Sequence, residues 1–483
     1  MIADLKPYPA MKDSGVPWLG QVPEHWAILP HRALFNEVKE RNHLNEQMLS
    51  VTITQGVIKQ RALLEGSSKK DSSNQDKSAY KLVCPGDIAY NKMRAWQGAV
   101  GVSDFRGIVS PAYVVVRLRD ENSPRYFHYL FRTPGFAKEA ERWSYGITSD
   151  MWSLRPEHFK MIYGCLPPLP EQTAIVRFLN HADRRIRSYI RAKQKLIKLL
   201  EEQKQAIIHR AVTRGLDPHV RLKPSGGEWL GDVPEHWEVS RFGRLIELIT
   251  GFPFKSEGFT QATDDIRLLR GINISPGQVR WNDVVRWPSA ERKEFAEYEL
   301  RPGDIVLGMD RPIIHAGVRV AVIEDSDVPS VLLQRVARIR TRQGLLADFV
   351  VLLLAGRSFS NYLTPIFTGI SVPHLSPEQI KSFRFALPSL DEQKQIVAQV
   401  ALETTAVQST VERADREIAL LREYRTRLIA EVVTGKFDVR EAAARLPEEE
   451  EEPEPLVDAE VLAESDEDGE GADLDTAPEE AEA

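Results

Sequence analysis

Two identical Glu-His-Trp triplets are the first residues in this chain whose types could do chemistry. They occupy residues 24–26 and 235–237, and a carboxylate beside an imidazole can transfer protons or bind a metal ion. However, one histidine per copy is too few ligands for a metal, and the flanking Trp-Leu-Gly and Val-Pro are typical of a packed segment. We therefore interpret both triplets as structural.

Two acids, Asp87 and Asp304, each stand in a Pro-Gly-Asp-Ile sequence. Glycine adopts a positive φ there and the aspartate accepts from its own backbone, which predicts a turn. The sequence holds no G-x-G-x-x-G, no G-x-x-x-x-G-K-[ST], no H-E-x-x-H and no Asn/Asp-Pro-Pro-aromatic run, and its 11 histidines are scattered. We predict that this chain has no catalytic centre.

The triplets belong to a longer internal repeat. SGVPWLGQVPEHW begins at Ser14 and SGGEWLGDVPEHW at Ser225, and ten of the thirteen positions are identical. LRPEHFK and LPPLPEQTAIV, from Leu154 and Leu166, match LSPEQIK and LPSLDEQKQIV, from Leu375 and Leu387. The stretches between these matches differ. A shared frame around dissimilar segments predicts one architecture that presents two different surfaces.

Each copy ends in a long predicted helix, because residues 171–214 and 391–434 contain no proline or glycine. Ser389 and Glu392 form a capping box, and Pro170 fits a first helical turn. The apolar seams predicted to pack are Ile175, Leu179, Ile186, Leu196, Leu200 and Ile207, then Ile396, Val400, Val407, Leu421 and Leu428. A helix roughly 65 Å long with one apolar stripe needs a partner. We predict an antiparallel coiled coil; the alternative is that each helix packs on its own domain.

The fold class predicted is mixed α/β: two similar globular domains joined by the two long helices, with an internal pseudo-two-fold repeat. Short strands are expected at residues 112–118, 305–307 and 318–323, and helices at 124–131 and 345–354. The predicted boundaries are 1–165 for the first domain, 166–216 for its helix, 217–386 for the second domain, 387–437 for its helix, and 438–483 for a tail.

The charge is unevenly distributed along the chain. Residues 448–483 contain 18 Asp and Glu and no Lys or Arg, so the rest carries +11 although the whole chain is −7. Such an acidic tail is predicted to be disordered, and a basic body suits nucleic acid. With two cysteines, no apolar run of membrane-spanning length and no secretory signal, we expect a cytoplasmic protein without a disulfide or a membrane.

Five motifs together resemble the specificity subunit of type I restriction–modification systems. They are the opening SGxxWLGxVPEHW, YNKMRAWQG from Tyr90, GIVSPAYVV from Gly107, the LPxLxEQxxIV helix start, and REYRTRLIAEVVTGKFDVR from Arg422. The resemblance covers about residues 11–440 and leaves out the acidic tail. Each motif alone is only moderately specific, but all of them occur in order and the first and fourth occur twice.

The resemblance implies a recognition role in host defence without catalysis by this chain. Each domain would be a target-recognition domain that reads one half of a bipartite, asymmetric site in double-stranded DNA, with the helices fixing the separation. The implied partners are two methyltransferase (modification) subunits, which bind S-adenosylmethionine and methylate adenine, and motor–nuclease (restriction) subunits. No cofactor is expected on this chain.

Candidate DNA contacts follow from side-chain chemistry, because base edges pair with Arg, Lys, Asn and Gln, and phosphates accept from Lys, Arg and Ser. In the first domain they are Lys69, Lys70, Asn91, Lys92, Arg94, Trp96, Tyr145 and Ser149. In the second they are Lys255, Ser256, Arg270, Asn273, Arg311 and His374. Each could instead be solvated or packed, and Trp96 in particular fits a core position.

Two alternatives remain open from the sequence. One is the recognition subunit of a modification-only or motor-less methyltransferase system, which genomic neighbours would distinguish. The other is a coiled-coil scaffold whose domains bind proteins, which predicts no salt-dependent DNA affinity. The acidic tail could screen a basic DNA groove or simply keep the chain in solution, and we favour the second role.

Overall fold

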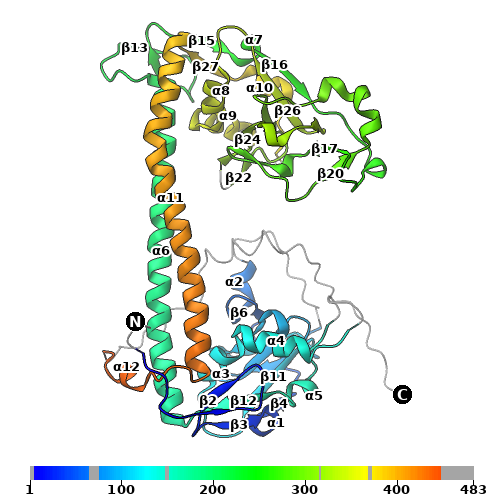
Figure 1. The fold of residues 1–483 in the computed structure, drawn as a ribbon, viewed down its shortest axis with the longest axis vertical. Helices are drawn as coiled ribbons and strands as arrows, with labels where there is room; N and C mark the ends of the chain where they lie inside the picture. Colours follow the sequence, from blue (N-terminus) through cyan, green and yellow to red (C-terminus); the bar gives the residue numbers. More distant parts are fainter. Residues whose placement is uncertain (1–4, 65–75, 147–151, 315–316, 368–372, 448–483) are drawn as a thin grey trace. The chain divides into compact units, whose positions relative to one another are not determined.

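The computed structural model describes residues 5–64, 76–146, 152–314, 317–367 and 373–447. The chain forms two compact units: residues 1–191 with 417–483, called the first unit, and residues 192–416, called the second unit. Each unit therefore contains one globular part and one portion of each long helix (Figure 1). The predicted tail, residues 438–483, is wrong at its start: Arg440–Ala444 form helix α12, and Val439 and Ala443 are buried in the core of the first unit. The acidic residues from 448 onward lie outside the described residues.

The first unit is built on a four-stranded antiparallel sheet. Its order is β4 (Phe35–Val38), β11 (Tyr113–Leu118), β8 (Ile88–Asn91) and β9 (Val100–Val102). The pairs beside it are β1 (Met11–Asp13) with β2 (Gln21–Pro23), β3 (Ala27–Pro30) with β12 (Tyr163–Leu166), β5 (Leu49–Thr52) with β6 (Gly56–Lys59), and β7 (Lys81–Val83) with β10 (Gly107–Val109). Its short helices are α1 (His31–Leu34), α2 (Gln60–Leu64), α3 (Pro124–Phe131), α4 (Pro134–Arg142), α5 (Pro156–Phe159) and α12 (Arg440–Ala444).

The core of the first unit lies between this sheet and α3. Strand β11 contains three successive valines, which suit a buried pleated surface. Helix α3 begins with Pro124 at its first turn and buries an aromatic face that includes Phe127 and Phe131. The predicted helix at 124–131 and the predicted strand at 112–118 are both confirmed, the strand starting at Tyr113.

The second unit contains a four-stranded antiparallel sheet with a corresponding order: β16 (Ile246–Thr250), β26 (Val336–Thr341), β21 (Ile305–Gly308) and β24 (Val320–Val322). A second sheet joins β20 (Val285–Trp287), β17 (Ile266–Leu269) and β25 (Ser330–Leu332). The remaining pairs are β13 (Leu222–Pro224) with β14 (Asp232–Pro234), β15 (Glu238–Arg241) with β27 (Arg384–Leu387), β18 (Ile274–Ser275) with β19 (Gln278–Val279), and β22 (Ile313–Ile314) with β23 (Gly317–Val318).

The helices of the second unit pack on its four-stranded sheet and are α7 (Phe242–Leu245), α8 (Ala347–Ala355), α9 (Arg357–Phe367) and α10 (Pro377–Ser382). The predicted helix at 345–354 thus starts at Ala347. The strand predicted at 318–323 is wrong as one element: it is split into β23 and β24, because the backbone of Arg319 turns to bond Pro312 and Gly308.

Two long helices, α6 (Leu169–Arg214) and α11 (Leu390–Val433), confirm the helices predicted from the absence of proline and glycine. The capping box also forms: Glu392 N–H donates to Ser389 Oγ at 3.3 Å, and Ser389 N–H donates to Glu392 Oε2 at 3.1 Å. Sheet and long helices together confirm the mixed α/β class.

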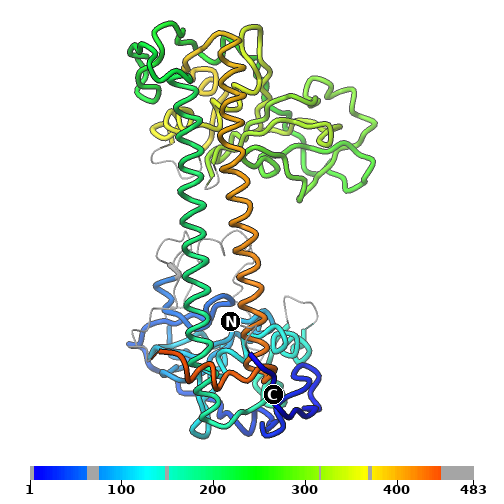
Figure 2. The backbone as a smooth tube through the Cα atoms, turned by 60° about the vertical axis from the view of Figure 1, so that its left-hand side comes forward, coloured from blue at the N-terminus to red at the C-terminus, as the bar shows by residue number. Residues whose placement is uncertain are grey.

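The two helices pack against each other within each unit (Figures 1 and 2). In the first unit Arg425 is paired with Asp183, and Leu428 shares a core with Ile175 and Leu179. In the second unit Lys204 Nζ donates to Gln408 Oε1 at 2.8 Å. In the first unit Leu428 lies further along α11 than Arg425, whereas its partners Ile175 and Leu179 lie earlier along α6 than Asp183. These portions of the two helices therefore run in opposite directions.

The predicted seam needs correction in the middle of α6. Leu196 keeps 39% of its surface exposed, and Leu200 and Ile207 are half-buried, whereas Ile208 is buried. A helix of 3.6 residues per turn drifts against a strict 3,4 pattern, so the buried face moves to neighbouring positions. Of the other predicted seam residues Leu421 is half-buried, and the following are buried: Ile175, Leu179, Ile186, Ile396, Val400, Val407 and Leu428.

No single helix among the described residues is long and apolar enough to cross a membrane. Helices α8 and α9 reach the length and apolar composition of a membrane span only when taken together, and the pair is bent by 50°. Their apolar side chains, among them Phe349, Leu353 and Phe359, are buried in the core of the second unit.

Candidate nucleic-acid interface

The two Pro-Gly-Asp-Ile turns are structural, as predicted. Asp87 accepts from Cys84 N–H at 2.8 Å and from Arg117 Nε and Nη2 at 2.7 and 2.9 Å. The preceding Gly86 has φ 88°, which explains why glycine stands there. The aspartate is 1% exposed, so its charge is neutralised by a bidentate arginine rather than by water.

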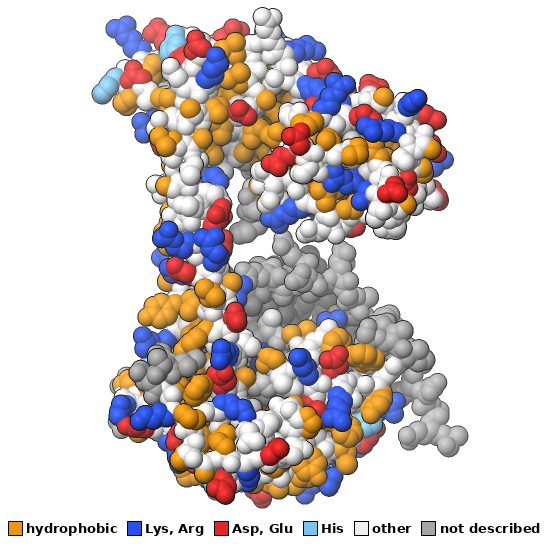
Figure 3. Space-filling model, in the orientation of Figure 1, with side chains coloured by type: hydrophobic (Ala, Val, Ile, Leu, Met, Phe, Trp, Pro, Cys, Tyr) orange, Lys and Arg blue, Asp and Glu red, His pale blue; other side chains and the backbone are white. Residues whose placement is uncertain are grey.

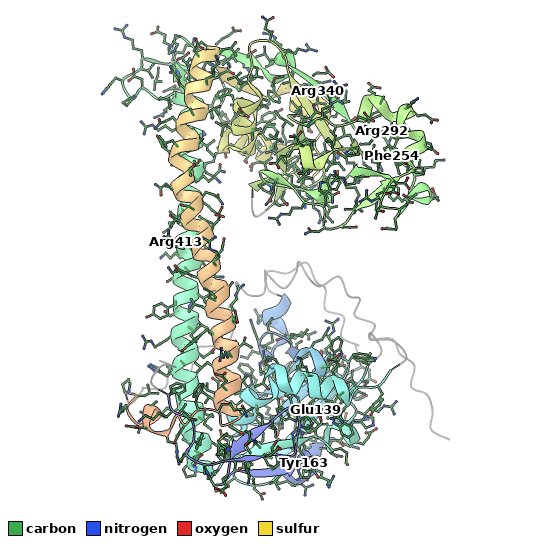
Figure 4. All side chains as sticks on the ribbon, in the orientation of Figure 1. Glu139, Tyr163, Phe254, Arg292, Arg340 and Arg413 are labelled. Carbon is green, nitrogen blue, oxygen red and sulfur yellow. The ribbon has the colours of Figure 1, made fainter. Side chains whose placement is uncertain are left out.

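The second turn repeats this arrangement. Asp304 accepts from Arg301 N–H at 2.8 Å and from Arg340 Nε and Nη2 at 2.5 and 2.9 Å. Figure 4 labels Arg340, which lies on β26 as Arg117 lies on β11. Neither arginine was predicted from the sequence. The signal that could have found them is that each arginine lies in a segment where arginines alternate with apolar residues, VVVRLR or VARIRT.

Each Glu-His-Trp triplet binds the start of the long helix of its own copy through hydrogen bonds to one glutamate. Trp26 Nε1 donates to Glu171 Oε2 at 2.9 Å, and His25 Nε2 lies 2.7 Å from Glu171 Oε1. In the second copy Trp237 Nε1 and His236 Nε2 contact Glu392 Oε1 at 3.1 and 2.7 Å. These contacts confirm the structural interpretation of both triplets.

Each unit contains one loop that is held by the same backbone contact as its counterpart in the other unit but carries different side chains. The loop after β8 is tied to the segment before α5 by Leu154 N–H donating to Lys92 O at 2.9 Å. The loop after β21 is tied to the segment before α10 by Leu375 N–H donating to Met309 O at 2.8 Å. Arg94 and Arg311 stand at the same distance after the turn aspartates, and both are exposed.

In the first unit this loop is partly self-supporting. Asn91 Oδ1 accepts from Met93 N–H at 3.0 Å, and Trp96 Nε1 donates to Met93 O at 2.9 Å. Trp96 is half-buried and its ring meets Trp152 edge-on at 5.5 Å. Trp96 and the carbonyl side of Asn91 therefore shape the loop.

The remaining polar candidates of the first unit differ in their exposure. Lys92 is half-buried, whereas Tyr145 is 57% exposed with its ring 4.8 Å from that of His158. Arg94 and Tyr145 are thus the predicted side chains that solvent, or a ligand, can reach most readily. Three other candidates, Lys69, Lys70 and Ser149, lie outside the described residues.

In the second unit the loop holds a charged cluster. Asp310 Oδ2 accepts from Arg335 Nη1 at 2.8 Å, and Asp310 Oδ1 lies 2.6 Å from His374 Nδ1. Partial burial raises the pKa of Asp310, but the hydrogen bonds from His374 and Arg335 outweigh it and leave that pKa below its ordinary value. Asp310 is therefore ionised at neutral pH. The sequence argument selected Arg311 and His374 but missed Asp310 and Arg335.

Two candidates of the second unit have structural roles. Asn273 is 2% exposed, and its side-chain amide donates to Arg280 O and Asp283 O at 3.1 and 3.0 Å, so its prediction as a base contact is wrong for this conformation. Arg270 is half-buried and pairs with the Asp283 carboxylate at 2.7 Å. Tertiary packing brings hydrogen-bond and ion-pair partners to these polar groups. No local sequence pattern reveals those partners.

Lys255 and Ser256 are exposed at the start of a short 3-10 helix, Ser256–Gly258. On the face that Figure 3 shows, Lys and Arg side chains are interspersed with Asp and Glu. Within the described ranges no three His, Cys, Asp or Glu side chains gather as a metal site would require. The exposed candidates thus lie on loops and carry hydrogen-bond donors.

Residues 234–401 match the family model of the type I restriction modification DNA specificity domain. This part of the chain is therefore similar to a DNA specificity domain. It runs from the second Glu-His-Trp triplet into helix α11 and contains Asp310, Arg335 and His374. The resemblance to type I specificity subunits is thereby confirmed.

Known relatives carry the same designation. The chain is 26% identical over 276 residues to the type I restriction enzyme MjaVIII specificity subunit of Methanocaldococcus jannaschii, covering 57% of this chain and 62% of that one. It is 34% identical over 207 residues to the EcoAI specificity subunit of Escherichia coli, covering 42% of this chain and 34% of the other. The chain thus spans less than two thirds of either relative.

The fold is also that of a solved structure. A chain of a type I restriction–modification system, from a study of complex assembly and conformational transition, superposes with a TM-score of 0.60 at 17% identity. The superposition covers 85% of this chain and 98% of that one. The likeness in fold therefore extends beyond residues 234–401 into the first unit.

Proposed function

We propose that this chain is the DNA sequence-specificity subunit of a type I restriction–modification complex and has no catalytic centre of its own. Each globular part reads one half of a bipartite, asymmetric site in double-stranded DNA. The specificity domain at 234–401 and the similarity to named specificity subunits support this proposal.

The observation that carries the proposal is a common backbone frame with exchanged side chains. Counting from the paired turn aspartates and strand arginines, Asp310 corresponds to Met93 and Arg335 to Ala112. Two domains that read different half-sites need the same scaffold with different donors and acceptors at the surface. A protein with two identical binding functions would have no reason to exchange them.

In this proposal residues 1–165 and 217–386 are the two target-recognition domains, and residues 166–216 and 387–437 are spacer helices that form an antiparallel coiled coil. The helices set the distance between the half-sites, as in other readers whose half-site spacing mirrors protein geometry. Two methyltransferase subunits supply S-adenosylmethionine chemistry, and motor–nuclease subunits join for restriction. This chain supplies only the choice of site.

Charge supports binding to DNA rather than to a protein. Outside residues 448–483 the chain carries +11. Lysines and arginines that neutralise phosphates release counterions, so affinity should fall steeply as salt rises. A protein-binding scaffold would show no such dependence on a DNA duplex.

The test is to co-express the chain with the methyltransferase encoded beside it and to map methylated adenines across the host genome. A matched strain lacks only this chain. We expect one bipartite motif with a fixed gap that disappears in the matched strain. Methylation that persists without the chain would refute the recognition role.

A further inference from the structure

The cluster of Asp310, Arg335 and His374 is held by backbone bonds that join three distant segments of the second unit. Met309 N–H donates to Arg335 O at 2.9 Å, and Arg311 N–H donates to Pro373 O at 2.8 Å. Asp310 and His374 also form an antiparallel bridge. The three side chains therefore start from fixed positions, as a recognition site requires.

The backbone of this cluster is strained. Arg311 has φ 44° and Arg335 has φ 66°, values that glycine adopts without cost but residues with a Cβ rarely do. Only three described non-glycine residues have positive φ: one of them, Arg335, belongs to the cluster, and another, Arg311, directly follows Asp310. Strain of this kind persists where a particular side chain is needed, because glycine would otherwise be the more stable choice.

The pairing of Arg335 leaves most of its guanidinium available. Asp310 takes up only Nη1, and among the described residues no acceptor contacts Nη2 or Nε. The side chain of Arg335 is 65% exposed, whereas that of Asp310 is 30% exposed. The carboxylate thus orients a planar fork of donors that faces outward.

The chemistry of the cluster favours a base edge over a phosphate. Asp310 is ionised and partly exposed beside the guanidinium, so it offsets the positive charge that would attract a phosphate and would repel that group. Guanine presents two neutral acceptors, O6 and N7, in the major groove, and arginine binds both at once. An oriented arginine with its charge partly offset matches this pair.

The cluster is absent from the first unit. The residues that correspond to Asp310, Arg335 and His374 are Met93, Ala112 and Ser153, by the register of the turn aspartates, the strand arginines and the Leu154–Leu375 match. None of these three carries a guanidinium, a carboxylate or an imidazole. The site can therefore serve only the half-site read by the second unit.

We propose that Arg335, oriented by Asp310 and His374, reads a guanine in the half-site recognised by the second unit. This inference rests on the proposed function. Arg335 determines specificity at one base pair, and Asp310 and His374 are positioning residues that act through it.

The experiment maps methylated adenines in strains that carry the full complex with wild-type chain, Arg335→Gln or Arg335→Gly. We expect the wild-type motif to contain a G·C pair at one position that both variants relax, with a loss of about tenfold in preference there. The other half of the motif should stay unchanged. Because glycine relieves the positive φ, Arg335→Gly should keep or raise the Tm of the complex, which separates lost reading from lost folding.

The matched control is Arg292→Gln. Like Arg335, Arg292 is an exposed arginine of the second unit and pairs with a carboxylate, that of Glu299. It lies on a different element, Ser289–Tyr298 (Figure 4). It should leave the motif unaltered. Equal weakening at all sequences would indicate a phosphate contact and overturn the inference, as would an unchanged motif or relaxation in both halves. If the wild-type chain directs no bipartite motif at all, the proposed function fails instead.

Discussion

Single residues decide the stability of the two Pro-Gly-Asp-Ile turns, each of which leads into a strand of a four-stranded sheet. Asp304 is 3% exposed and accepts two hydrogen bonds from Arg340 and one from the backbone of Arg301. Removing one member of a buried, hydrogen-bonded ion pair leaves the other charge poorly compensated.

We expect Asp304→Asn to lower the free energy of unfolding by about 3 kcal/mol, because Arg340 would lose its counter-charge. Denaturant titration followed by circular dichroism measures this change. The control is Asp391→Asn, whose carboxylate is 87% exposed beside Lys394 and should matter by less than about 0.5 kcal/mol. Equal effects of the two substitutions would contradict the buried role of Asp304.

His31 is a second residue with a measurable signature. It is fully buried among four aromatic rings, those of Phe35, Phe131, Phe136 and Phe159. Burial lowers the pKa of His31 to about 3 from its ordinary 6.5. The unfolded chain therefore binds a proton between pH 6.5 and 3 that the folded chain does not.

The contribution of neutral His31 to the free energy of unfolding is fully present above pH 6.5 and is lost as the pH falls toward 3. Between pH 7 and pH 5 the wild type should lose about 2 kcal/mol more than His31→Leu, which has no group to protonate. Denaturant titrations at several pH values test this. The buried His128 remains in both proteins and cancels in the difference, so parallel pH profiles would disprove the assignment.

At the scale of elements, the long helices depend on their buried faces more than on their length. Leu428 of α11 is 1% exposed and packs with Ile175 and Leu179 of α6, whereas Leu420 on the same helix is 63% exposed. A helix with one buried stripe draws most of its stability from that stripe.

Leu428→Ala should destabilise the first unit by about 3 kcal/mol, since it removes buried methyl groups and leaves a cavity. Thermal unfolding of the full chain gives the measurement. Leu420→Ala makes the same change in composition on an exposed face and should shift the Tm little. A large fall in Tm from Leu420→Ala would contradict the exposed position of Leu420 on α11.

The start of α11 depends on its capping box. Ser389→Ala removes the oxygen that accepts from Glu392 N–H and should cost about 1 kcal/mol of unfolding free energy. Ser409→Ala, on the exposed middle of the same helix, should be neutral or slightly stabilising because alanine favours helix. Denaturant midpoints of the two variants should therefore move in different directions or by clearly different amounts.

At the scale of the whole molecule, one frame used twice predicts independent readout of two half-sites. Arg94 and Arg311 occupy corresponding exposed positions in the first and second units. Arg94→Gln should change the methylation motif or its strength through one half-site, and Arg311→Gln through the other. Genome-wide methylation maps of both variants check this, and identical changes from both would contradict a division of labour.

The sequence alone predicted much of the scaffold. Local patterns suffice where neighbours in the chain determine the outcome: the Pro-Gly-Asp-Ile turns need a glycine with positive φ, and two proline-free, glycine-free stretches became α6 and α11. The repeated triplets indicated packed segments, and the motifs together carried the resemblance to type I specificity subunits. The drift of the seam at Leu196 and the break at Arg319 were missed, because both depend on packing partners.

The candidate contacts were predicted less well, since a polar residue in a loop looks the same in sequence whether it is exposed or satisfied. The tertiary structure buries Asn273 and directs its amide to the carbonyl groups of Arg280 and Asp283. It also brings together Asp310, Arg335 and His374, which are up to 64 residues apart. Turns and helices follow from short-range sterics and periodicity, which the sequence determines directly. The cluster of Asp310, Arg335 and His374 is brought together by long-range backbone pairing, so only the folded chain shows which side chains it contains.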